Sequence, residues 1–272
     1  MIMISIIVPV YCGANTITSL LTRIEGVFNR SLKNYRYEVI FVDDCSPDNS
    51  YDVIHELSRN NDNVLGIRLK NNVGQQNATY CGMHHVQGDI IITLDDDLQH
   101  EPELIPVLLS KLSGDTELVY GVFTERADGR HRKWGSKLTA QFFKQMFRNL
   151  GENRVSSFRL FTKSINERVI GQKYGFVYIS CLLLSKCGGV DNVVIPFTPR
   201  TNGRSNYNLV KLLKLFSKLY LNYGPLSKFY HGFVRENTPS FTIERTTLET
   251  DKGDDVLENH DAWRGIKSTV CN

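Results

Sequence analysis

Short β-branched runs alternate with helical segments through the first hundred residues, and this alternation constrains the fold more than any other feature. Four apolar runs have the length and composition of buried strands: Ile4–Val10, Tyr37–Asp43, Val64–Leu69 and Asp89–Leu94. The segments between them have helical spacing with turn residues at their ends: Asn15–Asn29, Asn49–Asn60 and Gly74–Val86. Strands that alternate with helices predict βαβ units, and therefore an α/β fold with a mixed, mainly parallel, Rossmann-like sheet flanked by helices.

Polar residues gather where these predicted strands end. The first run ends in Pro9-Val10-Tyr11, the second in Asp43-Asp44 and the fourth in Asp95-Asp96-Asp97. In open parallel sheets, ligands bind at the carboxyl ends of the strands. The sequence therefore predicts a ligand site lined by these carboxylates.

The acidic run that follows the fourth strand predicts a metal site. Three adjacent carboxylates repel one another at the edge of a core unless a cation neutralises them. Oxygen ligands suit Mg²⁺ or Mn²⁺, which can bridge to diphosphate oxygens. In an extended segment Asp95, Asp97 and Gln99 point to one side, and Asp96 points to the other, toward a ribose or sugar hydroxyl. A solvated acidic loop is the alternative, which the preceding apolar strand disfavours.

Two further loops carry ligand-binding residue types. The Asp44 carboxylate can accept a hydrogen bond from a base N–H or a ribose hydroxyl, whereas Ser46 and Asp48 have the residue types of a helix cap. The segment Asn71–Asn77 enters a helix whose first N–H groups are available to a ligand. It matches neither GxGxxG nor GxxxxGK[ST], so the sequence supports neither a dinucleotide site nor a P-loop.

Basic residues form two clusters rather than an overall positive charge. One loop holds Arg126, Arg130, His131, Arg132 and Lys133, and another holds Arg200 and Arg204 beside Ser205. Arginine forks bind phosphate bidentately, although a solvated basic loop is the alternative reading. A formal net charge of +3 is too small to indicate a nucleic-acid partner.

The second half of the chain contains two amphipathic segments. Ser136–Leu150 fits a helix that packs in the core or faces a membrane, and Tyr207–Tyr220 fits a basic helix suited to an anionic membrane surface. Pro102–Leu112 is also predicted as a helix, and Glu117–Phe123 as a strand.

No apolar run reaches the ~18 residues of a membrane span, and the apolar N-terminus is typical of a buried strand rather than of a signal peptide. The cysteines include no CxxC pair, which favours reduced thiols in a cytosolic protein.

Taken in order, these motifs resemble those of the inverting, family-2 glycosyltransferases with the GT-A fold. Within that family they are most similar to polyprenyl-phosphate glycosyltransferases related to dolichol-phosphate mannose synthase. The matching segments are Val8–Tyr11, Val42–Asp44, Ser46–Asp48, Asn72–Gln75, Gly82, Gly88-Asp89, Leu94–Gln99, Pro102-Glu103, Ser157–Leu160 and Arg200–Tyr207. The chain departs from the family pattern at Cys12-Gly13, Phe123, Ser157 and Asn206.

The resemblance implies a role for individual residues. Those implied to bind the nucleotide-sugar are Pro9, Tyr11, Asp43, Asp44, Gly74, Gln75, Asp95 and Asp96. Those implied to hold the metal and the donor diphosphate are Asp95, Asp97 and Gln99. Those implied to bind an acceptor phosphate or the diphosphate are Arg126, Arg132, Ser136, Arg200, Arg204 and Ser205. Asp95, Asp97 and Arg126 are the implied catalytic residues.

The resemblance also implies an organisation of the chain. Residues 1–206 form the GT-A domain, with a nucleotide-binding half over 1–100 and an acceptor half over 101–206. Residues 207–235 are expected to form a membrane-proximal helical segment. The polar and mildly acidic composition of residues 236–272 predicts a flexible tail. The predicted protein is cytoplasmic and peripheral on the inner face of the membrane, and it can be a homo-oligomer.

The predicted reaction moves a sugar, with inversion, from a nucleotide-sugar (a UDP-sugar is favoured) to a polyprenyl phosphate, with Mg²⁺ or Mn²⁺ as cofactor. Transferases that glycosylate sugar hydroxyls usually carry a Glu-Asp motif as base. No Glu-Asp pair occurs in the chain, which favours a phosphate acceptor. Two alternatives stay open: transfer to a growing saccharide, and a catalytically weak, nucleotide-binding membrane adaptor. A nucleotidyltransferase would need a Lys-containing triphosphate loop near the N-terminus, and Val10–Ser19 contains no Lys.

Overall fold

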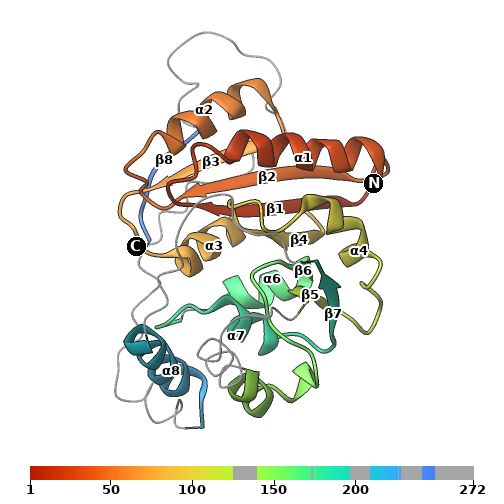
Figure 1. Cartoon of the computed structure of the whole chain (residues 1–272), viewed down its shortest axis with the longest axis vertical. Coiled ribbons are helices and arrows are strands. Elements are labelled where there is room, and N and C mark those ends of the chain that lie inside the picture. Colours follow the sequence, from red (N-terminus) through yellow and green to blue (C-terminus); the bar gives the residue numbers. More distant parts are fainter. Residues whose placement is uncertain (125–139, 173, 197–208, 226, 228–240, 249–272) are drawn as a thin grey trace. The chain divides into compact units, whose positions relative to one another are not determined.

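The computed structural model describes residues 1–124, 140–172, 174–196, 209–225, 227 and 241–248 (Figure 1). The chain divides into two compact units. The first contains residues 1–106 together with the described residues 241–248, and the second contains the described residues between 107 and 239. Each unit has its own strands and helices.

The first unit is built on a mainly parallel sheet with the strand order β4-β1-β2-β3-β8. Four strands are parallel, namely β1 (Met3–Val10), β2 (Arg36–Asp43), β3 (Val64–Leu69) and β4 (Ile90–Thr93). The strand β8 (Ile243–Thr246) pairs antiparallel with β3 at the edge. The register pairs Val10 with Asp43 and Asp43 with Arg68, so the ends of β1, β2 and β3 lie next to one another.

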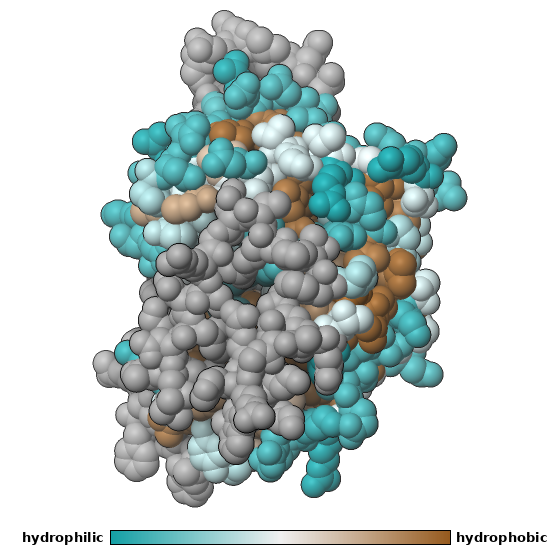
Figure 2. All heavy atoms as spheres, in the orientation of Figure 1, coloured by the Kyte–Doolittle hydropathy of each residue, from teal (hydrophilic) through white to brown (hydrophobic). Residues whose placement is uncertain are grey.

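Helices cover both faces of this sheet. Figure 1 shows α1 (Ile17–Arg30) and α2 (Ser50–Asn60) on one side of the strands and α3 (Gln75–Met83) on the other. The buried side chains of α1 recur every three or four residues: Ile17, Leu20, Leu21, Ile24, Val27 and Phe28. On the face drawn in Figure 2, hydrophilic residues dominate the surface over α1 and α2. Both helices are therefore amphipathic, with their apolar sides against the sheet. The short helix η1 (Pro102–Leu104) continues into α4 (Ile105–Leu109).

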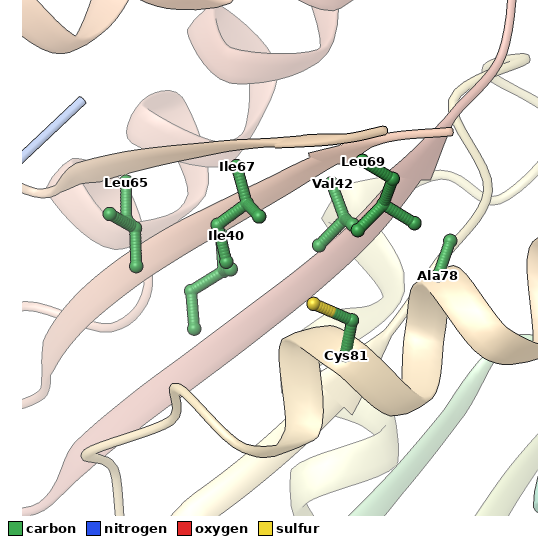
Figure 3. Packing of buried hydrophobic residues seen from close by; sticks show 7 residues of the cluster. All are labelled: Ile40, Val42, Leu65, Ile67, Leu69, Ala78 and Cys81. Carbon is green, nitrogen blue, oxygen red and sulfur yellow. The ribbon is translucent and has the colours of Figure 1, made fainter. Parts of the chain in front are cut away.

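A hydrophobic cluster fills the space between α3 and the strands β2 and β3. It contains Ile40, Val42, Leu65, Ile67, Leu69, Ala78 and Cys81 (Figure 3). Phe241, Ile243 and Leu248 pack against it from the C-terminal segment. The prediction of a flexible tail from residue 236 is therefore wrong for residues 241–248, because their apolar side chains cover this cluster. Residues 249–272 lie outside the described part of the chain.

The second unit has the strand order β7-β5-β6. The strand β5 (Leu118–Phe123) is parallel to β7 (Val190–Ile195) and antiparallel to β6 (Arg159–Thr162). Its helical segments are residues 140–146, η2 (Arg148–Leu150), α6 (Lys163–Ile170), α7 (Ile179–Leu184) and α8 (Leu209–Tyr223).

The segment 140–146 belongs to the core of the second unit. Phe142 and Phe143 are buried, and the Phe142 ring lies 6.3 Å from that of Phe216 on α8. The Phe143 ring lies 6.0 Å from that of Tyr178. Of the two readings of Ser136–Leu150, the described residues therefore take the core one, although this helix ends at residue 146 and not at Leu150. In the parts of the chain that the structure describes, no helix has the length and apolarity to cross a membrane.

The α/β fold with a mixed, mainly parallel sheet is confirmed. All four predicted strands of the first hundred residues form, and so does the predicted strand over Glu117–Phe123. The sequence analysis missed β6, β7, β8, α6 and α7. The predicted boundaries at residues 206 and 235 stay a prediction.

Candidate functional site

Four loops follow the four parallel strands of the first unit and lie at one edge of its sheet. They are residues 11–16 after β1, 44–49 after β2, 70–74 after β3 and 94–101 after β4. Carboxyl ends of parallel strands share an edge, and ligands of open α/β sheets bind there. These four segments are called the β1, β2, β3 and β4 loops below.

The β1 loop is tied to the start of α2 and to the β2 loop. The Cys12 N–H donates to Ser46 Oγ at 3.1 Å, and the Gly13 N–H donates to Ser50 Oγ at 3.0 Å. Tyr11 has 53% of its surface exposed, so its ring is available to a ligand. Pro9, in contrast, is buried within β1.

The β2 loop is tied to the β3 loop by Asp44. One Asp44 oxygen accepts the Val73 N–H at 2.7 Å, and the other accepts the Gly74 N–H at 2.8 Å. Asp44 has only 3% of its surface exposed. Asp44 therefore holds the backbone that enters α3, where Gly74 adopts a φ of +85°. Its predicted contact with a nucleotide base stays a prediction.

Asp43 is buried beneath the same loop. Both of its carboxylate oxygens lie 3.3 Å from the Ser46 N–H, and its side chain is inaccessible to solvent. Burial raises the pKa of the Asp43 carboxyl, while the Ser46 hydrogen bonds and the Arg68 guanidinium lower it. Asp43 thus shapes the loop, and its predicted contact with the donor stays a prediction.

The β4 loop is a turn and not an extended segment. Asp96 and Asp97 lie in the turn, and Leu98 has a φ of +61°. The extended segment on which the predicted alternation of Asp95, Asp97 and Gln99 depends is therefore not formed, because the strand β4 ends at Thr93. Asp97 Oδ1 instead accepts the Gln99 N–H at 3.1 Å, and Gln99 is buried.

The carboxylates of the β4 loop tie it to both neighbouring loops. Asp95 accepts a hydrogen bond from the Gln75 side chain at the start of α3. Asp96 Oδ2 accepts the Tyr11 N–H at 3.3 Å. Burial raises the pKa of Asp96 to about 7, the Tyr11 N–H opposes the rise, and Asp95 and Asp97 add to it. Asp96 therefore points toward the β1 loop, whereas a ribose or sugar hydroxyl was predicted as its partner.

The four loops are thus cross-linked into a closed ring. Successive links join the β1 loop to the β2 loop, the β2 loop to the β3 loop, the start of α3 to the β4 loop, and the β4 loop back to the β1 loop. A Cβ added to Gly13 would lie 2.5 Å from Asp96 Oδ2. A residue with a side chain at position 13 would therefore require the Asp96 carboxylate to shift.

A family model described as glycosyl transferase family 2 matches residues 5–174, which include all four loops. The chain belongs to glycosyl transferase family 2. The family resemblance inferred from the sequence motifs is confirmed.

Curated relatives of this family-2 chain are described as undecaprenyl-phosphate 4-deoxy-4-formamido-L-arabinose transferases. The one from Shewanella sediminis is 30% identical over 217 residues, which are 79% of this chain and 65% of that protein. The one from Pseudomonas syringae pv. syringae is 29% identical over 217 residues, which are 79% of this chain and 64% of that protein. The chain therefore spans less than two thirds of the length of these relatives.

Solved structures with the same fold include a mannosyl-3-phosphoglycerate synthase and a glucosyl-3-phosphoglycerate synthase. Mannosyl-3-phosphoglycerate synthase from Rubrobacter xylanophilus has a TM-score of 0.60 at 15% identity, covering 87% of this chain and 77% of that one. Glucosyl-3-phosphoglycerate synthase from Mycobacterium tuberculosis, solved with Mn²⁺, UDP and phosphoglyceric acid, has a TM-score of 0.57 at 16% identity, covering 82% and 77%. The predicted GT-A-type fold of the family-2 chain is confirmed.

Asp95 and Asp97 have the side-chain type that binds a divalent cation. Both carboxylates are partly exposed at the turn after β4, and Mg²⁺ is usually bound through one or two carboxylates together with substrate phosphates. Among the described residues, no three His, Cys, Asp or Glu side chains form a metal-binding group. The predicted role of Gln99 as a third ligand stays a prediction.

The predicted acceptor residues Arg126, Arg132, Ser136, Arg200, Arg204 and Ser205 lie outside the described residues. The described part contains two site features that the sequence analysis missed. His100 is buried, and its Nδ1 accepts the Asp95 N–H at 3.1 Å. Ser46 and Ser50 hold the β1 loop, whereas capping was the role considered for Ser46. A hydroxyl near a strand end is a signal for such a tie, but its partner lies more than 30 residues away.

Proposed function

We propose that this family-2 chain transfers a sugar from a nucleotide-sugar to a polyprenyl phosphate, with inversion, and uses Mg²⁺ or Mn²⁺. The observation that carries the proposal is the β4 loop, whose Asp95 and Asp97 carboxylates follow a buried strand and lie in the ring of four loops. The relatives named for undecaprenyl-phosphate transfer support the acceptor class. A fold neighbour solved with UDP and Mn²⁺ supports the donor class and the metal.

Asp95 and Asp97 would hold the metal in this proposal. A bound Mg²⁺ or Mn²⁺ would neutralise the charge that develops on the leaving diphosphate. The other residues of the ring keep the two carboxylates in place, because Gln75 holds Asp95 and Asp96 holds the backbone of the β1 loop. The exposed Tyr11 ring offers a surface for the nucleotide base.

The acceptor needs no general base in this reaction. A polyprenyl phosphate is already an anionic nucleophile, so a single in-line displacement at the anomeric carbon forms the new bond as the diphosphate leaves. Arg126, Arg132, Ser136, Arg200, Arg204 and Ser205 are proposed to bind the acceptor phosphate or the diphosphate.

The helix α8 supports a membrane-surface location in this proposal. Its residues Lys214 and Lys218 are exposed, as are Tyr220 and Leu221. Exposed lysines together with an exposed aromatic residue on one helix suit an anionic membrane surface. Such a position would bring the chain to a lipid-linked acceptor.

Transfer assays with defined acceptors test the proposal. The protein is incubated with Mn²⁺ or Mg²⁺ and a panel of nucleotide-sugars that includes UDP-glucose and a UDP-linked 4-deoxy-4-formamido-arabinose, with and without undecaprenyl phosphate. We expect a glycosylated lipid product that requires both the metal and the lipid phosphate. The absence of both donor hydrolysis and transfer under all conditions would contradict the proposal that the protein is an enzyme. Transfer to an oligosaccharide alone would sink the lipid-phosphate proposal and leave the enzyme proposal standing.

A further inference from the structure

The edge strand β8 lies against β3 next to the ring of loops. The Lys70 N–H donates to the Thr242 carbonyl at 2.8 Å, directly after the end of β3. Gly66 and Thr247 exchange two hydrogen bonds, with the Gly66 N–H donating to Thr247 Oγ1 at 3.1 Å and the Thr247 N–H donating to the Gly66 carbonyl at 3.0 Å. The strand β8 is therefore bonded along β3 up to the residues that lead into the β3 loop.

Arg68 on β3 lies between β8 and Asp43. Its Nε is 3.3 Å from Glu244 Oε2 on β8 and 3.9 Å from Asp43 Oδ2 on β2. Its guanidinium carbon lies 5.5 Å from the centre of the Tyr51 ring on α2. The Arg68 side chain is thus held by β8 on one side and α2 on another, with its charge directed at a buried carboxylate.

Asp43 connects Arg68 to the β2 and β1 loops. It accepts the Ser46 N–H, and Ser46 Oγ in turn accepts the Cys12 N–H. Glu244, Arg68, Asp43, Ser46 and Cys12 therefore form one chain of charged and hydrogen-bonded contacts. This series of contacts runs from β8 to the β1 loop, which carries the exposed Tyr11.

Within this series of contacts, Asp43 is the residue whose buried carboxylate needs a cationic partner. An exposed ion pair contributes little to stability, and Glu244 is 40% exposed. The Asp43 side chain is 0% exposed, and a buried carboxylate that loses its cationic partner must protonate, rearrange or recruit another donor. Each of these responses would disturb the Ser46 N–H that Asp43 holds.

We propose that Arg68 and Glu244 are positioning residues of the donor site, which hold the β1 and β2 loops in their binding geometry through Asp43 and Ser46. The proposal rests on the proposed function, because it takes the ring of loops to be the nucleotide site. It makes the C-terminal strand β8 a working part of that site. The contribution is to the base-and-ribose side of the donor, whereas Asp95 and Asp97 serve the diphosphate.

Nucleotide binding by the full chain tests the proposal. The dissociation constants of UDP and of inorganic pyrophosphate are measured calorimetrically in the presence of Mn²⁺. We expect Arg68→Met to weaken UDP about tenfold or more, Glu244→Gln to weaken it about threefold, and Arg68→Lys to retain most of the affinity because the cation is kept. The affinity for pyrophosphate should stay unchanged in all three variants. Donor KM should rise in parallel with the UDP dissociation constant while kcat changes less.

Two controls separate positioning from a general loss of structure. Glu56→Gln removes the same charge as Glu244→Gln from an exposed position on α2, and it should leave UDP binding unchanged. The melting temperature of Glu244→Gln should stay close to that of the wild type. This variant can therefore test the proposal even if Arg68→Met folds poorly. UDP affinity equal to the wild type in Arg68→Met and Glu244→Gln overturns the positioning role, as does an equal loss of UDP and pyrophosphate. A wild-type protein that binds none of UDP, GDP, CDP and ADP overturns the proposed function and this inference together.

Discussion

The two units of the chain differ in the side chains that make most of the ties described for their irregular segments. In the first unit, carboxylates make most of the ties between the loops, beside the Ser46 and Ser50 hydroxyls: Asp44 and Asp96 accept backbone N–H groups, and Asp95 accepts the Gln75 amide. In the second unit, asparagine amides make several ties to backbone carbonyls, beside the Glu117 carboxylate, which accepts the Gly188 N–H at 2.8 Å. Asn149 Nδ2 donates to the Leu184 and Cys187 carbonyls at 2.9 Å each, and Asn153 Nδ2 donates to the Val190 carbonyl at 2.9 Å.

The two kinds of tie differ in whether they can also bind a metal ion. The amide nitrogens that make these ties donate to buried carbonyls at any pH and cannot ligate a cation. Carboxylates hold the loops of the first unit and also supply the oxygen ligands that Mg²⁺ and Mn²⁺ prefer. The first unit therefore combines scaffold and candidate metal site in neighbouring carboxylates of the same loop, whereas the asparagine ties of the second unit are scaffold alone.

The largest expected effect comes from removing a carboxylate of the candidate metal site. Asp97→Ala should reduce metal-dependent UDP binding on the order of 100-fold or more, because Asp97 is one of the two side chains proposed to hold the metal. Titration of UDP with and without Mn²⁺ measures it. As a matched control, Asp191→Asn changes a partly exposed carboxylate of the second unit and should leave binding intact. Unchanged UDP binding in Asp97→Ala would contradict the assignment.

A smaller effect should follow from crowding the ring. Gly13→Ala places a methyl group 2.5 Å from Asp96 Oδ2, and such overpacking costs about 1–3 kcal/mol. We expect the free energy of unfolding to fall by this amount and UDP affinity to fall with it. Gly114→Ala is the comparison, because its Cβ would meet nothing within 4 Å. If both variants bind UDP like the wild type, the ring does not depend on the contact between Gly13 and Asp96.

Breaking a tie of the second unit should affect stability without affecting donor binding. Asn149→Ala leaves the Leu184 and Cys187 carbonyls without this donor, which should cost about 1–3 kcal/mol of unfolding free energy. Denaturant unfolding measures the loss, and calorimetry should give an unchanged UDP dissociation constant. A loss of UDP affinity in Asn149→Ala comparable to that of Gly13→Ala would contradict the claim that this tie of the second unit does not contribute to donor binding.

The smallest expected effect is a pH dependence that arises at the opposite ends of the strands. Glu38 has 1% of its surface exposed and accepts the Gln87 N–H at 2.7 Å and the Ser5 hydroxyl. Burial raises its pKa, and these hydrogen bonds oppose the rise. Since the folded-state pKa lies above the unfolded value of about 4.3, Glu38 contributes stability below that value and loses it as pH rises through the folded pKa.

Glu38→Gln should therefore remove this decline from the pH dependence of unfolding on the acidic side of neutrality. Measured from about pH 4 upward, the stability of the wild type relative to this variant should fall as pH rises. The exposed Glu56→Gln should leave the slope unchanged. A wild-type stability that rises relative to Glu38→Gln over the same range would reverse the assigned direction of the pKa shift.

The strands of the first unit were predictable because each carries its own signal. The runs Ile4–Val10 and Val64–Leu69 are apolar on both faces, as buried parallel strands are, and they form almost as predicted. The missed strands lack this signal. The strand β6 has four residues and contains the buried Arg159, and β7 begins Val-Asp-Asn. Arg159 is buried because it donates to Ser180 Oγ at 3.2 Å, a partner on α7 that no local pattern indicates.

By itself the sequence determined that carboxylates stand at the ends of buried parallel strands, because strand and helix periodicity are local properties of the chain. Only the tertiary structure decided what each carboxylate does. Asp44 and Asp96 hold neighbouring loops because their partners Val73, Gly74 and Tyr11 come from other strand ends. The strand β8 likewise depends on a partner 181 residues away, since Gly66 bonds to Thr247. Contacts over such separations are set by how the units fold in space, which local periodicity does not specify.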